Sequence, residues 1–293
     1  MSGLTGLGRV SIVGAGQIGT MIGQALTGAD QRWGVLEVGL QDRDPAIAAE
    51  ALALGGGDRV LVGMDQVLVA DVIILAIPVT GIVEWIETWG SRVPPGSLLI
   101  DTGSSKGAVV AAMARTVPAG AAAVGGHPIC GSEANGPAAA RQEALRNAPF
   151  VLTPVREDGP ALTLATRLVQ SLGARPVTMA AAVHDRIVAR SSHLPHVVAG
   201  TLARLCRDSG LVDPSTVALL GPGFRGATRL AESDPEMVAS FLVANATQVA
   251  AAVADLSAEL SRLAEALSLG QGSVAEILRD GAAARRDLLG ASQ

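Results

Sequence analysis

The spacing of apolar residues changes character at about residue 179. Before it, short runs of β-branched and other apolar residues alternate with longer Ala- and Leu-rich stretches, a pattern typical of strands that alternate with helices. The segments expected to be strands are Val10–Val13, Leu36–Leu40, Val72–Ile77, Ser97–Ile100, Ala122–Val124, Val151–Thr153 and Pro176–Met179. The pattern predicts an α/β fold over residues 1–179: a mostly parallel, doubly wound sheet with helices on both faces and a nucleotide site at the carboxyl ends of the strands.

Residues 180–293 carry no strand signal and are expected to be all-helical. The clearest helix is expected to begin at Ser233-Asp234-Pro235-Glu236, a capping box in which Ser233 accepts a backbone N–H and Glu236 reaches back. Apolar or small residues then recur at helical spacing, namely Val238, Phe241, Leu242, Val249, Val253, Leu256, Leu260, Leu263 and Leu267. Unbroken, this helix would be roughly 50 Å long at ~1.5 Å per residue. Because a small domain could hardly bury such a stripe, we expect an intertwined homodimer; two helices broken near Asp255 are the alternative.

Composition and charge narrow the class of protein. A formal net charge of −5 argues against nucleic acid or an anionic membrane as partner, since both need a broad positive field. The strongest apolar run, Val72–Val79, is too short to span a bilayer, and Met1–Val10 lacks the basic and apolar regions of a secretory signal. Two cysteines, Cys130 and Cys206, are too few for a disulfide framework. We therefore expect a cytoplasmic protein.

A glycine loop follows the first expected strand. Its residues are Gly14, Ala15, Gly16, Gln17, Ile18 and Gly19, and Met21–Leu26 reads as the helix after it. A strand, a GxGxxG loop and a helix in this order are the context in which a dinucleotide pyrophosphate is bound. The chain is therefore expected to bind a dinucleotide at residues 14–19.

Asp42 follows the second strand, where a carboxylate meets the adenosine ribose of NAD. This position favours NAD, whereas Arg43 beside it could hold the 2′-phosphate of NADP. The alternative role for Asp42 is purely structural, as a solvated carboxylate in a turn. Ile77 and Pro78, at the end of the third strand, are also expected to line the cofactor site.

The segment Asp101–Gly107 ends one strand and opens a helix. Ser104 is expected to point into the crevice at the sheet edge, with an N-cap as its alternative role, and Asp101 is assigned to the cofactor site. Lys106, the single lysine of the chain, opposes the helix dipole, so we expect it to have an anion or a carboxylate as neighbour.

Histidines and arginines supply the remaining candidate chemistry. His127, held out of helical geometry by Pro128, closes a strand at the same sheet edge and is a candidate base. His193 and His196 lie three residues apart on a helix that Pro195 should kink, but no third ligand or carboxylate completes a metal site, so no metal is expected. Farther along the chain, Arg225 and Arg229 are candidates for binding a carboxylate.

Together these motifs resemble the prephenate/arogenate dehydrogenase family of tyrosine biosynthesis, in the family's order and over nearly the whole chain. The matching segments are the glycine loop, Asp101–Lys106, Gly125–Pro128 with Gly131-Ser132-Glu133, His184-Asp185, Ser192–His196, Gly223-Phe224-Arg225 with Thr228-Arg229, and Ser233–Met237. The resemblance implies a Rossmann-type domain over 1–179, an all-helical dimerisation domain over 180–293, and oxidative decarboxylation of a cyclohexadienol with NAD or NADP.

The resemblance also implies roles for the site residues. His127 would act as the base, Ser104 would orient the hydroxyl or His127, and His196 would face the substrate. Arg229 would pair with a substrate carboxylate, and Arg225 would hold the loop or share that charge. His193 would support His196, and Ser132 is assigned to substrate binding. Prephenate is the expected substrate.

Two departures from the family pattern leave the substrate open. Gly226 stands where the family commonly has aspartate and Val238 where it has tryptophan. Arogenate or 4-amino-4-deoxyprephenate are alternative substrates, whose ammonium would favour a nearby carboxylate such as Glu133 or Asp185. A β-hydroxyacid dehydrogenase leaves the His-Pro and His-Leu-Pro-His motifs unexplained. A non-enzymatic NAD sensor has no need of the residues Ser104, His127, His196 and Arg229 together.

Overall fold

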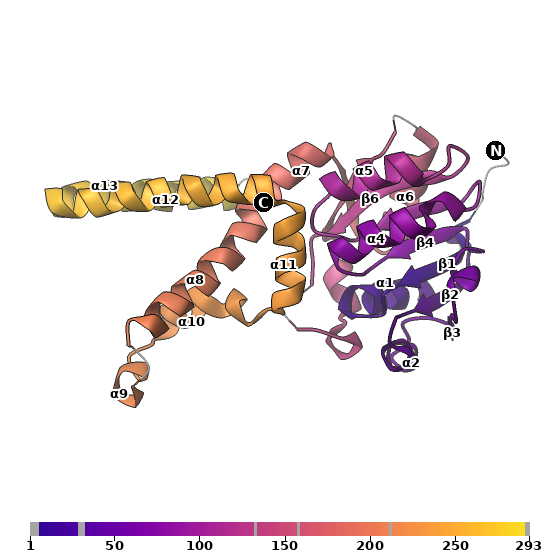
Figure 1. Cartoon of the computed structure of the whole chain (residues 1–293), viewed down its shortest axis with the longest axis horizontal. Helices are drawn as coiled ribbons and strands as arrows, with labels where there is room; N and C mark the ends of the chain where they lie inside the picture. The colour runs from indigo at the N-terminus through magenta and orange to yellow at the C-terminus, as the bar shows by residue number, and fades with distance from the viewer. Residues whose placement is uncertain (1–5, 29–32, 132–133, 157–158, 211–212, 291–293) are drawn as a thin grey trace. The chain divides into compact units, whose positions relative to one another are not determined.

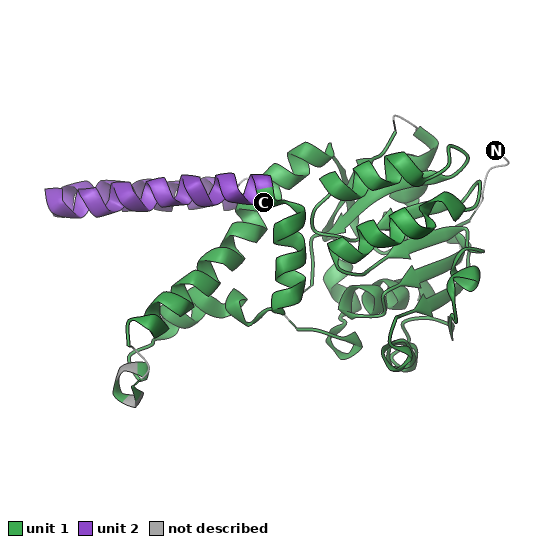
Figure 2. Cartoon of the chain, in the orientation of Figure 1, with its two compact units in different colours: residues 1–246 green, residues 247–293 purple. Residues whose placement is uncertain are grey.

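The computed structural model describes residues 6–28, 33–131, 134–156, 159–210 and 213–290. By their contacts they form two compact units, residues 1–246 and 247–293 (Figure 2). The first unit contains the sheet and the helices up to Ala244, and the second contains two long helices (Figure 1).

The described residues form a sheet of eight strands in the order β3-β2-β1-β4-β5-β6-β7-β8. Every neighbouring pair is parallel except β6 with β7. The strands are β1 Gly8–Val13, β2 Val35–Gln41, β3 Arg59–Val60, β4 Val72–Leu75, β5 Leu98–Asp101, β6 Ala122–Pro128, β7 Pro149–Pro154 and β8 Arg175–Thr178. All seven expected strands are present, whereas β3, only two residues long, was not predicted.

Helices cover both faces of the sheet. Those of the sheet region are α1 Gln17–Thr27, α2 Pro45–Ala53, α3 Met64–Val67, α4 Val79–Trp89, α5 Gly107–Thr116 and α6 Gly159–Ser171, with 3-10 turns η2 Gly90–Arg92, η3 Pro137–Ala139 and η4 Gln142–Leu145. Along β4, Val72 and Ile74 pack with α1, α2 and α6, whereas Ile73 and Leu75 pack with α4 and α5. This two-residue alternation divides the core into two layers and confirms the doubly wound α/β prediction.

The chain after β8 is helical, as predicted. It contains α7 Ala181–Val188, the π-helical turn η5 Ala189–His193, α8 Leu194–Asp208, α9 Pro214–Val217, α10 Pro222–Thr228, the 3-10 turn η6 Arg229–Glu232, α11 Pro235–Ala244, α12 Ala246–Leu269 and α13 Gln271–Gly290. Pro195 lies in the first turn of α8, directly after the π turn, and the kink expected at this proline stays a prediction. No single described helix is long and apolar enough to cross a membrane, and α11 with α12 meets that test only as a bent pair.

The long helix predicted from residue 233 onward is wrong in two respects. Asp234, not Ser233, caps it, because the Asp234 carboxylate accepts the Met237 N–H at 2.8 Å. The helix also ends at Ala244, and the break lies at Asn245, not near Asp255. Asn245 is buried, and its side-chain amide lies within hydrogen-bond distance of the Asp185 carbonyl oxygen and of His193 Nδ1.

Candidate active site

The glycine loop at the end of β1 has the geometry that its sequence predicts. Gly14 has φ +97°, a backbone conformation that favours glycine. A Cβ on Gly19 would lie 1.9 Å from the Gly14 carbonyl oxygen, so this glycine lets α1 approach the strand closely. A Cβ on Gly16 would meet no atom within 4 Å. The backbone at Gly16 is therefore open to a ligand, which is what close approach of a pyrophosphate requires.

Asp42 holds this loop from the end of β2. Its Oδ2 accepts the Ala15 N–H at 2.8 Å and its Oδ1 accepts the Asp44 N–H at 3.0 Å. The Ile77 side chain borders Gly14, and Pro78 stands immediately before α4. Asp42 and Ile77 thus border the loop at the carboxyl edge of the sheet, and Pro78 follows Ile77 along the chain.

A buried ion pair lies at the end of β5. The Lys106 ammonium bonds the Asp101 carboxylate, and it also donates to the Gly126 carbonyl oxygen at 2.6 Å. Asp101 further accepts the N–H groups of Gly103 at 2.7 Å and Gly126 at 2.9 Å. The expected carboxylate neighbour of Lys106 is thereby confirmed. These bonds tie the ends of β5 and β6 together, and the Asp101 carboxylate is fully buried in doing so.

Asp185, on α7, is bound to the first turn of α5. Its carboxylate accepts the backbone N–H groups of Lys106 at 2.7 Å and Gly107 at 2.8 Å, and it bonds His184 Nδ1 at 2.8 Å. Burial raises the pKa of Asp185, but the hydrogen bonds from His184, Lys106 and Gly107 lower it more, so the pKa lies below its ordinary value. Asp185 is therefore a carboxylate held by protein donors, and its role as partner of a substrate ammonium stays a prediction.

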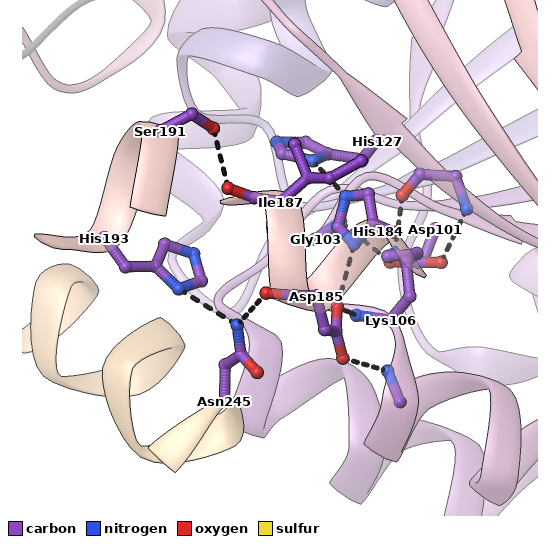
Figure 3. A network of polar contacts seen from close by, with 12 residues as sticks. Asp101, Gly103, Lys106, His127, His184, Asp185, Ile187, Ser191, His193 and Asn245 are labelled. Atoms are coloured by element: carbon purple, nitrogen blue, oxygen red, sulfur yellow. Dashed lines mark hydrogen bonds and ion pairs between the residues drawn. The ribbon is translucent and has the colours of Figure 1, made fainter. Parts of the chain in front are cut away.

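His127 is joined to this carboxylate through a second imidazole (Figure 3). Its Nδ1 lies 2.9 Å from His184 Nε2, and the two rings meet edge to face with centroids 5.1 Å apart. Burial lowers the pKa of His127 well below its usual 6.5, and the nearby His184, Lys106 and His193 add to this effect. His127 is thus neutral near pH 7, as a group that accepts a proton must be.

His193 and His196 flank Phe241 of α11. His193 stacks on the Phe241 ring with centroids 4.6 Å apart, and His196 meets it edge-on at 5.3 Å. Asn245 lies between His193 and α7: its Nδ2 is 3.3 Å from His193 Nδ1 and donates to the Asp185 carbonyl oxygen at 2.8 Å. Burial lowers the pKa of His193 to about 4, against the opposing effects of Asp185 and the Ser104 backbone.

His196 has one nitrogen engaged and Arg229 lies on the neighbouring turn. His196 Nδ1 bonds the Ser192 carbonyl oxygen at 2.9 Å, and the side chain is half-buried. Arg229 begins η6, which packs against α8, and both it and Arg225 are exposed in this unit. Ser132 and Glu133 lie outside the residues that the structure describes.

The structure therefore brings residues that follow β5 and end β6 close to residues of α7 and the π turn after it. Ser104, Lys106, His127 and His193 share one neighbourhood, as the electrostatic effects on both histidines indicate. The sequence placed His184 in a family motif without a role and gave no role to Asn245. Within the described parts of the chain, no group of three or more His, Cys, Asp or Glu side chains could hold a metal ion.

Comparison with known proteins gives a consistent result over both parts of the chain. Residues 26–178 match the domain described as prephenate dehydrogenase, nucleotide-binding domain, and residues 180–279 match prephenate dehydrogenase, dimerization domain. The sheet region and the helical region each correspond to one of these domains.

Individual relatives agree with the domain matches. A cyclohexadienyl dehydrogenase of Zymomonas mobilis is 29% identical over 269 residues, which cover 90% of each chain. A prephenate dehydrogenase of Lactococcus lactis is 30% identical over 81% of this chain and 65% of its own length. The structure of Aquifex aeolicus prephenate dehydrogenase with hydroxyphenyl propionate and NAD+ superimposes with a TM-score of 0.87 at 25% identity, covering 98% of this chain and all of that one.

Proposed function

This chain belongs to the prephenate dehydrogenase family, and on that premise we propose that it catalyses the NAD-dependent oxidative decarboxylation of prephenate to 4-hydroxyphenylpyruvate. The observation that carries the proposal is the position and the neutral state of His127. A neutral imidazole stands at the carboxyl end of β6, on the same edge of the sheet as the glycine loop after β1, with its Nδ1 already engaged by His184. Among the described residues its Nε2 makes no hydrogen bond and is left to act on a substrate hydroxyl.

The glycine loop fits a dinucleotide. The open backbone at Gly16 and the N-terminus of α1 would hold the pyrophosphate, and the residues Ala15, Gln17, Ile18 and Asp42, with Ile77 and Pro78, would line the rest of the cofactor. Asp42 favours the ribose hydroxyls of NAD, whereas NADP would need Arg43 to receive a 2′-phosphate. When bound, NAD takes a hydride from the ring carbon that bears the substrate hydroxyl.

His127 would move one proton and give it back. As the hydride leaves, the hydroxyl proton passes to His127 Nε2 and the carbon–oxygen bond becomes a carbonyl. The bond to the opposite ring carboxylate then breaks, carbon dioxide departs, and its electron pair makes the ring aromatic. The phenolate oxygen takes the proton back from His127, so no proton is gained or lost overall, and the protein mainly positions the ring and balances charge.

The remaining site residues would orient the substrate. We propose that Ser104 orients the substrate hydroxyl or His127. His196 would face the substrate from the helical region, and His193, which stacks on Phe241, would support it. Arg229 would pair with a substrate carboxylate, assisted by Arg225 and by Ser132. Asp101, whose carboxylate is buried, would act from beneath the cofactor site by holding the β5–β6 edge.

The proposal also covers the domain boundary, the oligomeric state and the cellular location of the protein. We place the domain boundary at residue 179, supported by the end of β8 at Thr178 and by the change between the two family domains. A homodimer through the C-terminal helices is supported by leucines exposed within the second unit, among them Leu260, Leu267 and Leu278. Two free cysteines fit the cytoplasm.

A turnover assay tests this function directly. NADH or NADPH absorbance would be followed with prephenate, arogenate and 4-amino-4-deoxyprephenate, each with NAD and with NADP. We expect the highest kcat/KM with prephenate and NAD. Turnover of an amino substrate alone would overturn the substrate assignment, and binding of NAD without turnover of any substrate would favour a sensor.

A further inference from the structure

We propose that His184 and Asp185 are positioning residues that hold His127 in the tautomer whose Nε2 carries no hydrogen. The inference rests on the proposed function in so far as it gives His127 Nε2 the task of taking the hydroxyl proton. Its structural part, the protonation pattern of the three residues, stands on the hydrogen bonds alone.

Asp185 determines where the first hydrogen lies, because a carboxylate only accepts hydrogen bonds. Its oxygens receive the N–H groups of Lys106 and Gly107 from the first turn of α5, where the helix dipole also favours a negative charge. The third partner is His184 Nδ1, at 2.8 Å from Oδ1. His184 Nδ1 must therefore carry the hydrogen of that bond.

The same reasoning then fixes His127. A neutral imidazole with its hydrogen on Nδ1 has an acceptor at Nε2. His184 Nε2 lies 2.9 Å from His127 Nδ1, so His127 must donate from Nδ1. Its remaining nitrogen, Nε2, is left with a lone pair. If His184 were an imidazolium it would donate from both nitrogens, and His127 would carry its hydrogen on Nε2, where it could not act as a base.

The chain of bonds is anchored on every side. His184 is buried, and Asp185 is fixed by α5 and also through its carbonyl oxygen, which accepts the Asn245 amide at 2.8 Å. Figure 3 shows these residues meeting between α7, the start of α5 and the end of β6. When His127 gains a proton, its Nδ1–H still points to His184, and the negative charge of Asp185 lies one imidazole away to stabilise the imidazolium.

Nitrogen-15 NMR of histidine-labelled protein tests the protonation pattern without any substrate. The chain has only four histidines, and each has a defined partner. We expect the hydrogen on Nδ1 in the residues His127, His184 and His196, and on Nε2 in His193, whose Nδ1 accepts from Asn245. A His127 that is protonated on Nε2 in the wild type would overturn the proposal.

Asp185→Asn adds the kinetic test. Asp185 Oδ1 serves both the Lys106 N–H and His184 Nδ1, and Oδ2 serves the Gly107 N–H, so an amide, which has one oxygen, turns its NH2 toward a backbone donor of α5 in either orientation. The variant also removes the negative charge that holds the hydrogen on His184 Nδ1 and that stabilises the His127 imidazolium. We expect kcat to fall by about 10²–10⁴-fold, the range for loss of a general base, with KM little changed. An unchanged kcat in a folded variant would overturn the role.

A control separates this effect from the loss of a carboxylate that accepts a backbone N–H in general. Asp58 accepts the Val38 N–H at 2.7 Å beside β2, and Asp58→Asn removes the same charge far from the site, so its kcat should stay at the wild-type value. If Asp185→Asn does not fold, His184→Phe keeps a ring in place, removes the acceptor for His127 Nδ1 and should likewise lower kcat. Absence of turnover in the wild type would refute the proposed function, whereas the NMR pattern would still decide the tautomers.

Discussion

The Lys106 ammonium lies against the Asp101 carboxylate, and neither side chain is exposed to solvent. Burial lowers the pKa of Lys106, although Asp101 and Asp185 raise it. Removing the cation would leave Asp101 as an uncompensated buried charge. Lys106→Met is therefore expected to lower the free energy of unfolding by about 3–5 kcal/mol in urea denaturation.

Arg115→Met is the control for this measurement. Arg115 bonds Glu87 at 3.0 Å, but both side chains are more than half exposed, so solvent weakens their attraction. Its loss should cost less than about 1 kcal/mol. Equal effects of the two substitutions would contradict the structural importance of the buried pair.

A second prediction contrasts two glycines of the loop. Gly16→Ala should leave stability unchanged, since its Cβ meets no atom, but should raise the Kd for NAD by about tenfold or more, equal to ~1.4 kcal/mol. Gly19→Ala should lower stability by at least about 1–3 kcal/mol, because its Cβ would collide with the Gly14 carbonyl oxygen. Thermal unfolding and NAD titration of both variants check this. An unchanged Kd for Gly16→Ala would mean that the pyrophosphate lies elsewhere.

Periodicity was enough to predict most of the sheet. β4 and β5 are continuous apolar runs, which indicate burial on both faces of the sheet, and such a run is a property of each segment alone. Strand β3 has two residues and is too short to show any period. Its existence depends on pairing with β2, which no local pattern reveals.

The errors at the helical end have a different origin. Ser233 and Asp234 both suit an N-cap, and backbone geometry decided for Asp234. The break at Asn245 depends on hydrogen bonds to His193 and Asp185, residues more than 50 positions away. The link from His127 to Asp185 is likewise made by folding. Sequence motifs predicted His127 as the candidate base, but its partners His184 and Asp185 could be identified only from the packing of α7 against α5.

His127→Asn tests the base. We expect kcat to fall by about 10²–10⁴-fold with NAD binding retained, because an amide cannot take the hydroxyl proton. The lowered pKa also predicts a pH profile: the active neutral form exists above the pKa, so wild-type kcat is lost only as pH falls well below 6.5. Stopped-flow or steady-state rates between pH 5 and 8 would measure this, and an acid limb centred at pH 6.5 or higher would exclude His127 as the titrating base.

Arg229→Ala tests recognition of the substrate carboxylate. The loss of one charge-assisted hydrogen bond, about 1.5–3 kcal/mol, should raise KM by roughly 10–100-fold. The exposed Arg207, paired with its neighbour Asp208, supplies the control, and Arg207→Ala should leave KM unchanged. A fall in stability without a change in KM would remove Arg229 from the site.

His193 predicts how stability depends on pH. Its pKa is lowered to about 4 by burial, whereas an unfolded histidine has an ordinary value near 6.5. Between these values the unfolded chain binds a proton that the folded protein does not, so the free energy of unfolding falls as pH drops from about 6.5 toward 4. His193→Gln should reduce this slope by up to ~1.4 kcal/mol per pH unit, since one titrating proton is removed. Urea denaturation at several pH values would measure both slopes. Because His127 acts in the same direction, some slope should persist in the variant, and identical slopes in variant and wild type would mean that His193 is protonated in the folded protein.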